Sequence, residues 1–241
     1  MLHKTRGIVF KTTNYAESSV IVQVFTEKLG LQSYLINGVR KQKAKITLNM
    51  LQPLHLLDMV VYHKANANIQ RVSEIRQMPV FQSIPYDIIK SSLTIFLNEV
   101  IYKTVRLESK DELLFDFLYH AIELLDRTEK GLANFHLHVL VRLTRFLGFF
   151  PDQYSYRDNA YFDLKSGAFS MQMPPHNFVI EPPQSQIWYH LITCSFENLE
   201  ELNIHSTNRK LLLEYLLDYY RLHTENFGEI RSQTVLAELF S

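Results

Sequence analysis

Four cations crowd into one short stretch of this 241-residue chain, residues 34–45, which reads YLINGVRKQKAK. They are Arg40, Lys41, Lys43 and Lys45. No carboxylate occurs between Lys28 and Asp58, so nothing nearby in the sequence neutralises them. A nucleic-acid backbone supplies closely spaced phosphates, and the stretch therefore predicts a loop that binds DNA or RNA. A solvated loop that keeps the protein soluble is the alternative, and charge alone does not separate the two.

Other side chains of the same region extend this prediction. Lys11 and Arg6 are expected to continue the basic surface along the predicted barrel. A base stacked on an exposed ring contributes about 1–3 kcal/mol, whereas most rings in a small barrel lie in its core. The rings considered are Phe10, Tyr15, Phe25, Tyr34 and Tyr62. Tyr34 lies beside the basic loop in the sequence and is the preferred stacking residue.

A second candidate site lies far along the chain, on a predicted helix. Arg142 and Arg145 fall on nearly the same face of that helix, next to Phe146. A basic rim around an apolar groove suits an acidic, hydrophobic peptide tail, so these residues are predicted to bind a partner. Arginines that merely solvate a helix surface are the alternative reading.

Signatures of catalysis and of metal binding are weak. The seven glycines never cluster, which excludes a phosphate-binding loop and a dinucleotide fingerprint. His136 and His138 diverge on a helix, so they form a poor metal site. Cys194 is the only cysteine, which excludes an internal disulfide and any multi-cysteine metal site, and we expect a core thiol. The sequence predicts a protein that is not an enzyme and holds no metal or cofactor.

Composition and charge suggest two domains in a cytoplasmic protein. The hydrophobic fraction of 46% and the charged fraction of 21% are those of a globular chain. No membrane span or signal peptide is apparent. Residues 1–76 hold 11 Lys and Arg against 4 Asp and Glu, although the whole chain balances 25 against 25. A basic N-terminal part and an acidic remainder favour different partners for the two. The alternative is that the two parts attract each other or a second subunit.

The hydrophobic pattern places these residues on an α+β fold. Five short strands are predicted at residues 7–14, 20–26, 31–36, 51–62 and 69–76. They suit an OB-type β-barrel, with an SH3-like barrel as the nearest competitor, and the basic loop then adjoins the nucleic-acid-binding face. Helical spacing takes over after the prolines at 79 and 85. We therefore predict an OB domain at 1–79 and a helical domain at 80–241, with a β-hairpin inserted around 154–173.

Several of these motifs occur together in one known family. They are the strand Gly7-Ile8-Val9-Phe10, the turn Tyr15-Ala16-Glu17, the hairpin with Thr26 and Gly30, the basic loop with Gly38, Arg40 and Ala44, the helix exit LGFFPD at 147–152 and the tail GEIRSQTVLAELF at 228–240. In this order they resemble the RecO family of bacterial recombination mediators. The resemblance covers nearly the whole chain and is most specific over residues 5–45.

The resemblance implies an N-terminal OB domain and a C-terminal helical domain. Such proteins bind single- and double-stranded DNA, anneal strands, bind the C-terminal tail of single-strand-binding protein, and act with RecR to load RecA. Many members carry four zinc-binding cysteines between the helices, and residues 154–173 contain none. The hairpin is then expected to be held by packing of Tyr156, Tyr161, Phe162 and Phe169. An RNA-binding or translation-associated OB protein, and a structural adaptor whose barrel docks on an acidic protein, remain the alternatives.

Overall fold

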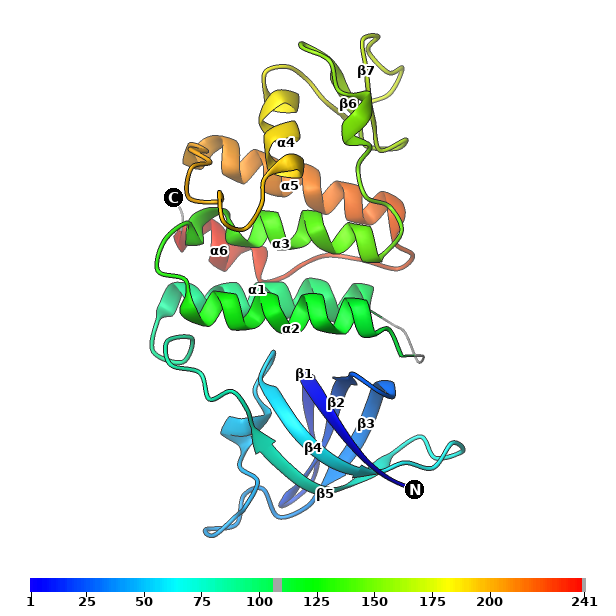
Figure 1. Cartoon of the computed structure of the whole chain (residues 1–241), viewed down its shortest axis with the longest axis vertical. Helices are drawn as coiled ribbons and strands as arrows, with labels where there is room; N and C mark the ends of the chain where they lie inside the picture. Colours follow the sequence, from blue (N-terminus) through cyan, green and yellow to red (C-terminus); the bar gives the residue numbers. More distant parts are fainter. Residues whose placement is uncertain (106–109, 240–241) are drawn as a thin grey trace. The chain divides into compact units, whose positions relative to one another are not determined.

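Five strands at the start of the chain close into a barrel (Figure 1). They are β1 (Leu2–Ala16), β2 (Ser19–Thr26), β3 (Gly30–Ile36), β4 (Leu56–Tyr62) and β5 (Gln70–Gln77). The strand order is β1-β2-β3-β5-β4, and β1 pairs with both β2 and β4 to close the ring. The β3–β5 pairing is parallel and the other pairings are antiparallel. This topology confirms the predicted OB-type barrel, within a computed structural model that describes residues 1–105 and 110–239.

The barrel interior is filled from alternate positions of its strands. Val20, Val22 and Val24 of β2 are all fully buried, as period-two alternation requires. Tyr34 and Ile36 of β3 join the same cluster. The interior is therefore built mainly from β-branched side chains, which suit a pleated surface.

The barrel and two helices form the first of the chain's two compact units, Met1–Arg127. These helices are α1 (Ile88–Thr104) and α2 (Glu112–Arg127). Phe25, on the outside of the barrel, is buried with its ring 5.9 Å from Phe115 of α2. The Asn98 amide of α1 donates to the Phe10 carbonyl at 3.1 Å. The two helices thus shield apolar rings that the barrel alone would expose.

The predicted strand at residues 51–62 is shorter in the structure. A 3₁₀ helix, η1 (Leu48–Leu51), comes first, and β4 starts only at Leu56. Between them Leu54 has φ of 58°, in the left-handed region that breaks extended pairing, while it remains fully buried. The run of apolar residues therefore predicted a strand that begins too early in the chain.

Gly7 lies where two strands pack closely inside the barrel. A Cβ atom built there meets Val24 Cγ1 at 2.6 Å and Met59 Sδ at 2.8 Å. We expect Gly7→Ala to cost about 1–3 kcal/mol of unfolding free energy through overpacking. Urea denaturation of the Val24→Ala background supplies the control, because removing Cγ1 should offset part of that cost while the Met59 contact remains. Equal costs in both backgrounds would contradict this packing argument.

The second unit, Thr128–Ser241, is mainly helical. Its helices are α3 (Leu132–Phe146), α4 (Gln184–Thr193), α5 (Ser206–His223) and α6 (Gln233–Leu239). The Tyr220 hydroxyl of α5 donates to the Leu140 carbonyl of α3 at 2.7 Å, and both residues are fully buried. No helix in the described part of the chain is long and apolar enough to cross a membrane.

The predicted β-hairpin is present and has a third strand. Short strands β6 (Tyr161–Asp163) and β7 (Ala168–Ser170) pair as predicted, and β8 (Val179–Ile180) pairs with the other edge of β6. The turn between 3₁₀ helix η2 (Gln153–Ser155) and β6 places Tyr156 flat against Tyr189 of α4, with ring centroids 3.8 Å apart. Phe162 packs against Phe169 at 4.8 Å. Aromatic packing therefore anchors this sheet to its unit.

Candidate nucleic-acid interface

The basic loop connects β3 to η1, and its two ends are fixed by burial. Val39 is 4% exposed, and its amide donates to the Ser18 carbonyl at 3.0 Å. Ile46, near the other end, packs against the barrel core. Gly38 has φ of 75°, which lets the chain turn sharply after β3. The loop is consequently anchored while the residues between its anchors face solvent.

The cations of this loop are exposed, as their charge requires. Lys41, Lys43 and Lys45 all lie on the surface. Arg40 is also exposed, and its guanidinium donates to the Glu17 carbonyl at 3.1 Å and to Asn14 Oδ1. Neither acceptor carries a charge, so Arg40 keeps its positive charge while bracing the loop against the β1–β2 turn. The structure thus places Arg40 beside that turn and exposes the other three cations on the same loop.

Lys11 lies on the outside of β1 and is exposed. Its ammonium is 5.4 Å from the centroid of the Tyr102 ring, which is a cation–π contact. Such a contact leaves the charge of Lys11 uncompensated. Lys11 therefore presents an exposed positive charge on β1, away from the loop in sequence.

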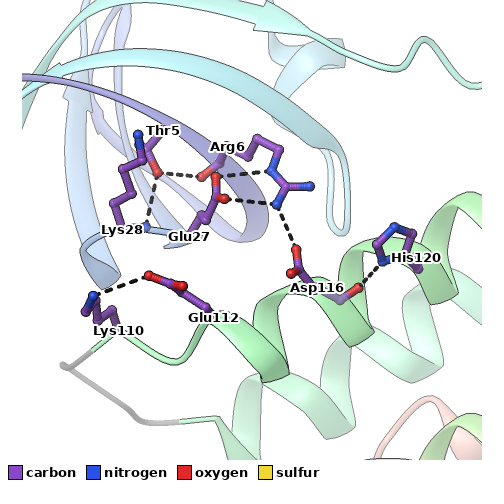
Figure 2. Close-up of polar contacts among 8 residues, drawn as sticks. All are labelled: Thr5, Arg6, Glu27, Lys28, Lys110, Glu112, Asp116 and His120. Carbon is purple, nitrogen blue, oxygen red and sulfur yellow. Dashed lines mark hydrogen bonds and ion pairs between the residues drawn. The ribbon is translucent and has the colours of Figure 1, made fainter.

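Arg6 does not fit the predicted role. Its guanidinium forms a paired contact with Glu27, at 3.1 and 3.0 Å, and reaches Asp116 Oδ1 at 2.7 Å (Figure 2). It also lies over the rings of Phe115 and Tyr119, at 5.1 and 4.8 Å. The hydrogen bond to Glu27 raises the pKa of Arg6 and lowers that of Glu27. Two carboxylates already neutralise this cation, so it serves to join β1 to α2.

Tyr34 does not fit its predicted role either. Its side chain is fully buried inside the barrel, and burial raises the pKa of its phenol. A base cannot stack on a ring that has no exposed face. Tyr15 is 62% exposed and directly follows Asn14, to which Arg40 donates. The sequence pattern favoured Tyr34 over Tyr15, although the position of Tyr15 at a strand end, next to a turn, could have indicated that its ring is exposed.

In the second unit, the structure places Arg142 and Arg145 over one ring. Their guanidinium carbons lie 6.0 and 4.5 Å from the centroid of Phe150. Arg142 also donates to the Cys194 carbonyl, and burial lowers its pKa. Phe146, one turn along α3 from Arg142, is half-buried. Arg142 and Arg145 therefore lie around Phe150, a ring that the sequence did not single out, and partner binding at Arg142, Arg145 and Phe146 stays a prediction.

Cys194 also borders a hollow of about 430 Å³ in this unit. Ile187 and Leu202 supply apolar walls, and Glu201 supplies a carboxylate. Arg142 is not among the described residues that line this hollow, and the Glu201 carboxylate would repel an acidic ligand there. Within the part of the chain that the structure describes, no group of three or more metal-ligating side chains occurs.

A closed OB-type barrel with an exposed basic loop, followed along the chain by a helical unit with a small sheet, defines a two-unit α+β protein with an OB-type domain. Residues 1–81 match the family model described as "Recombination protein O N terminal", and residues 85–232 match "Recombination protein O C terminal". The chain belongs to the RecO family of DNA repair proteins.

Full-length relatives agree with this assignment. A protein of Bacteroides fragilis named "DNA repair protein RecO" is 36% identical over 241 residues, covering all of both chains. Proteins of the same name from Azobacteroides pseudotrichonymphae and Phocaeicola vulgatus are 35% and 34% identical, again over the full length of both chains. The similarity therefore extends across both compact units.

Proposed function

We propose that the Met1–Arg127 unit binds single- and double-stranded DNA through the β3–η1 loop, largely without regard to base sequence. The supporting observation is the set of exposed lysines, Lys41, Lys43 and Lys45, on a loop anchored by the buried Val39 and the partly buried Ile46. Lysine ammonium groups act as point charges toward phosphate, so they attract a backbone without reading bases. Arg40 adds a fourth charge close to the β1–β2 turn.

Tyr15 completes this proposed surface. It is exposed beside the turn that Arg40 braces, so a base that leaves the stack near the loop has a ring to rest on. Lys11 extends the surface along β1. Tyr34 and Arg6 have no part in it, because the first is buried and the second is neutralised by two carboxylates.

The wider role follows from family membership. We infer that this non-catalytic cytoplasmic protein anneals complementary strands and, with RecR, helps to load RecA on DNA coated by single-strand-binding protein. The acidic C-terminal tail of that protein is proposed to bind the second unit at Arg142, Arg145 and Phe146. Two arginines over Phe150 offer this tail both charge and an apolar surface.

Reversing the loop charges tests the DNA proposal. The variant Lys41→Glu/Lys43→Glu/Lys45→Glu should bind a fluorescein-labelled oligo(dT) about 100-fold more weakly, a loss of about 2.7 kcal/mol. The slope of log K against log salt should also fall by about 2, since about 0.7 counterions are released per phosphate of a single strand. Fluorescence anisotropy between 50 and 200 mM NaCl measures both quantities.

Lys130→Glu/Lys165→Glu/Lys210→Glu is the matched control, because it changes the net charge equally through exposed lysines of the other unit. Binding of the loop variant as tight as that of the control would refute the assignment. Competition between DNA and RNA oligomers of the same sequence addresses the alternative function. A strong preference for RNA would favour the RNA-binding role instead.

A further inference from the structure

Asn37 and Gly38 form the only Asn-Gly pair in the sequence, and they lie where β3 ends and the basic loop begins. Asn37 is exposed, so water reaches its side-chain amide. Gly38 has φ of 75° and carries no Cβ, so no side chain shields its backbone nitrogen. Among the described residues, the Gly38 amide has no hydrogen-bond acceptor in the chain. This nitrogen is therefore available to react with the side chain that precedes it.

A hydroxyl holds and polarises the side-chain carbonyl of Asn37. Ser19, at the start of β2, donates from Oγ to Asn37 Oδ1 at 2.8 Å. A nucleophile that attacks Asn37 Cγ drives negative charge onto Oδ1, and a hydrogen bond already directed at that oxygen strengthens as the charge grows. The Ser19 hydroxyl thus lies where a donor would stabilise the oxyanion of such a reaction.

A positive charge lies close to the nitrogen that would have to lose its proton. The side chain of Lys41 runs beside Gly38, because a Cβ atom built on Gly38 would lie 3.4 Å from Lys41 Cδ and 3.6 Å from Cε. The Lys41 amide also donates to the Gly38 carbonyl at 3.2 Å, which closes the turn. A neighbouring cation favours the anionic form of a group, so a deprotonated Gly38 nitrogen is stabilised here.

We propose that Asn37 is a site of spontaneous deamidation, with Gly38 as the nucleophile, Ser19 as the donor to the carbonyl and Lys41 as the stabilising charge. The backbone nitrogen of Gly38 loses its proton to solvent and bonds to Asn37 Cγ, which closes a succinimide ring. The Cγ–Nδ2 bond breaks, and Nδ2 takes a proton from water and leaves as ammonia. Water then opens the ring at either of its carbonyls, which gives aspartate or isoaspartate at position 37.

The product changes the charge of the basic loop and the length of its main chain. Residues 37–47 contain no acid, so a carboxylate at position 37 would be the first anion among its four cations. Isoaspartate also adds a methylene group to the main chain shortly before Val39, whose amide anchors the loop to the Ser18 carbonyl. We expect the modified loop to attract phosphates less strongly. This consequence rests on the proposed DNA binding, whereas the deamidation itself does not.

Two other exposed asparagines provide a control within the same molecule. Asn66 and Asn68 lie in the β4–β5 loop, but Ala67 and Ile69 follow them instead of glycine. The side chain of the following residue hinders the approach of its nitrogen to the asparagine Cγ, and glycine alone removes that hindrance. Exposure is therefore shared by all three asparagines, and the reactive arrangement is expected only at Asn37.

Peptide mapping of the full chain measures the reaction. Trypsin releases residues 29–40, in which Asn37 is the only asparagine, and residues 65–71, which contain Asn66 and Asn68. During incubation at pH 8, we expect the first peptide to deamidate about tenfold faster than the second, with fragment ions that place the change at Asn37. Both aspartate and isoaspartate should form, because a succinimide opens in two ways. Equal rates in the two peptides, or aspartate alone, would overturn the proposal.

Two pairs of variants separate activation from simple exposure. Ser19→Ala should slow the reaction about threefold, since water replaces the hydroxyl only in part, and Ser18→Ala should leave the rate unchanged. Lys41→Gln should slow it about twofold, and Lys45→Gln, which removes the same charge further along the loop, should have a smaller effect. If the Ser19 hydroxyl only restrained the amide, its removal would speed the reaction. An unchanged or faster rate in Ser19→Ala would therefore refute its role as a donor.

Binding measurements separate this inference from the proposed function. Asn37→Asp should bind labelled oligo(dT) about fivefold more weakly than Asn37→Gln, which keeps the position neutral, and should lower the salt slope by about 0.7. If the parent binds no oligonucleotide, the proposed DNA binding fails while the deamidation result stands. If the parent binds and the two variants match each other, only the consequence for the loop is wrong. Thermal unfolding of each variant checks that these exposed changes leave the fold intact.

Discussion

Replacing Phe162 with alanine should lower the free energy of unfolding of the Thr128–Ser241 unit by about 3–5 kcal/mol. Phe162 is fully buried on the central strand of the small sheet, with its ring 4.8 Å from Phe169, 5.5 Å from Trp188 and 6.0 Å from Tyr219. Because the sequence offers no cysteine cluster to bind a metal here, this packing has to hold the sheet to α4 and α5.

The intrinsic fluorescence of the protein can be used to follow this change. Trp188 is its only tryptophan and touches the altered site, so its emission during urea denaturation follows the relevant unit. Tyr154→Ala is the control, because Tyr154 belongs to the neighbouring η2 and is 83% exposed. We expect that change to stay within about 0.5 kcal/mol. Similar urea midpoints for the two variants would show that aromatic packing around Phe162 does not stabilise the sheet.

Acid should destabilise the same unit well before its carboxylates titrate. Burial lowers the pKa of His136 to about 3 and that of His138 to about 4, with Arg209 and Arg142 as further causes. An unfolded chain binds a proton at each histidine near pH 6.5. Stability is therefore complete above about pH 6.5 and falls as the pH drops toward 4, by up to about 1.4 kcal/mol per pH unit for each histidine.

His138→Phe isolates one of these contributions. The imidazole makes an edge contact with Phe196, with centroids 4.3 Å apart, and both of its nitrogens are buried without a hydrogen-bond partner in the described chain. A phenyl ring keeps that contact and cannot take a proton. Between pH 6 and 4.5 the unfolding free energy of the variant should fall less steeply than that of the parent. The difference should be up to about 1.4 kcal/mol per pH unit, the contribution of one histidine. Measurement at pH 8 gives the packing cost alone, and an unchanged acid slope would refute the assignment.

Local chemistry made much of the barrel predictable. Alternating valines and a glycine turn marked β2 and β3, and their predicted bounds agree with the structure to within one residue. The basic loop was visible because residues 37–47 carry turn and charge signals and nothing that could pair as a strand. Charged side chains on such a loop are exposed whatever the rest of the fold does.

Long-range geometry accounts for the two residues that were misassigned. Whether Tyr34 points inward depends on how the barrel closes, and a one-residue shift of register would have exposed it. Arg6 appeared free because its second partner, Asp116, lies 110 residues away. The strand β8 has only two residues, too few for a pattern to reveal. The sequence pattern thus did not reveal which distant segments pair with one another.

The rings that α1 and α2 cover also limit how this barrel can be reused in evolution. The family models meet between residues 81 and 85, but the first compact unit ends only at Arg127. A gene fusion made at the boundary between residues 81 and 85 would transfer Phe10 and Phe25 without α1 and α2. It would leave an exposed apolar patch on the new fusion protein. We therefore expect a transferred barrel to keep its apolar rings covered only if α1 and α2 are included, as in the compact unit Met1–Arg127.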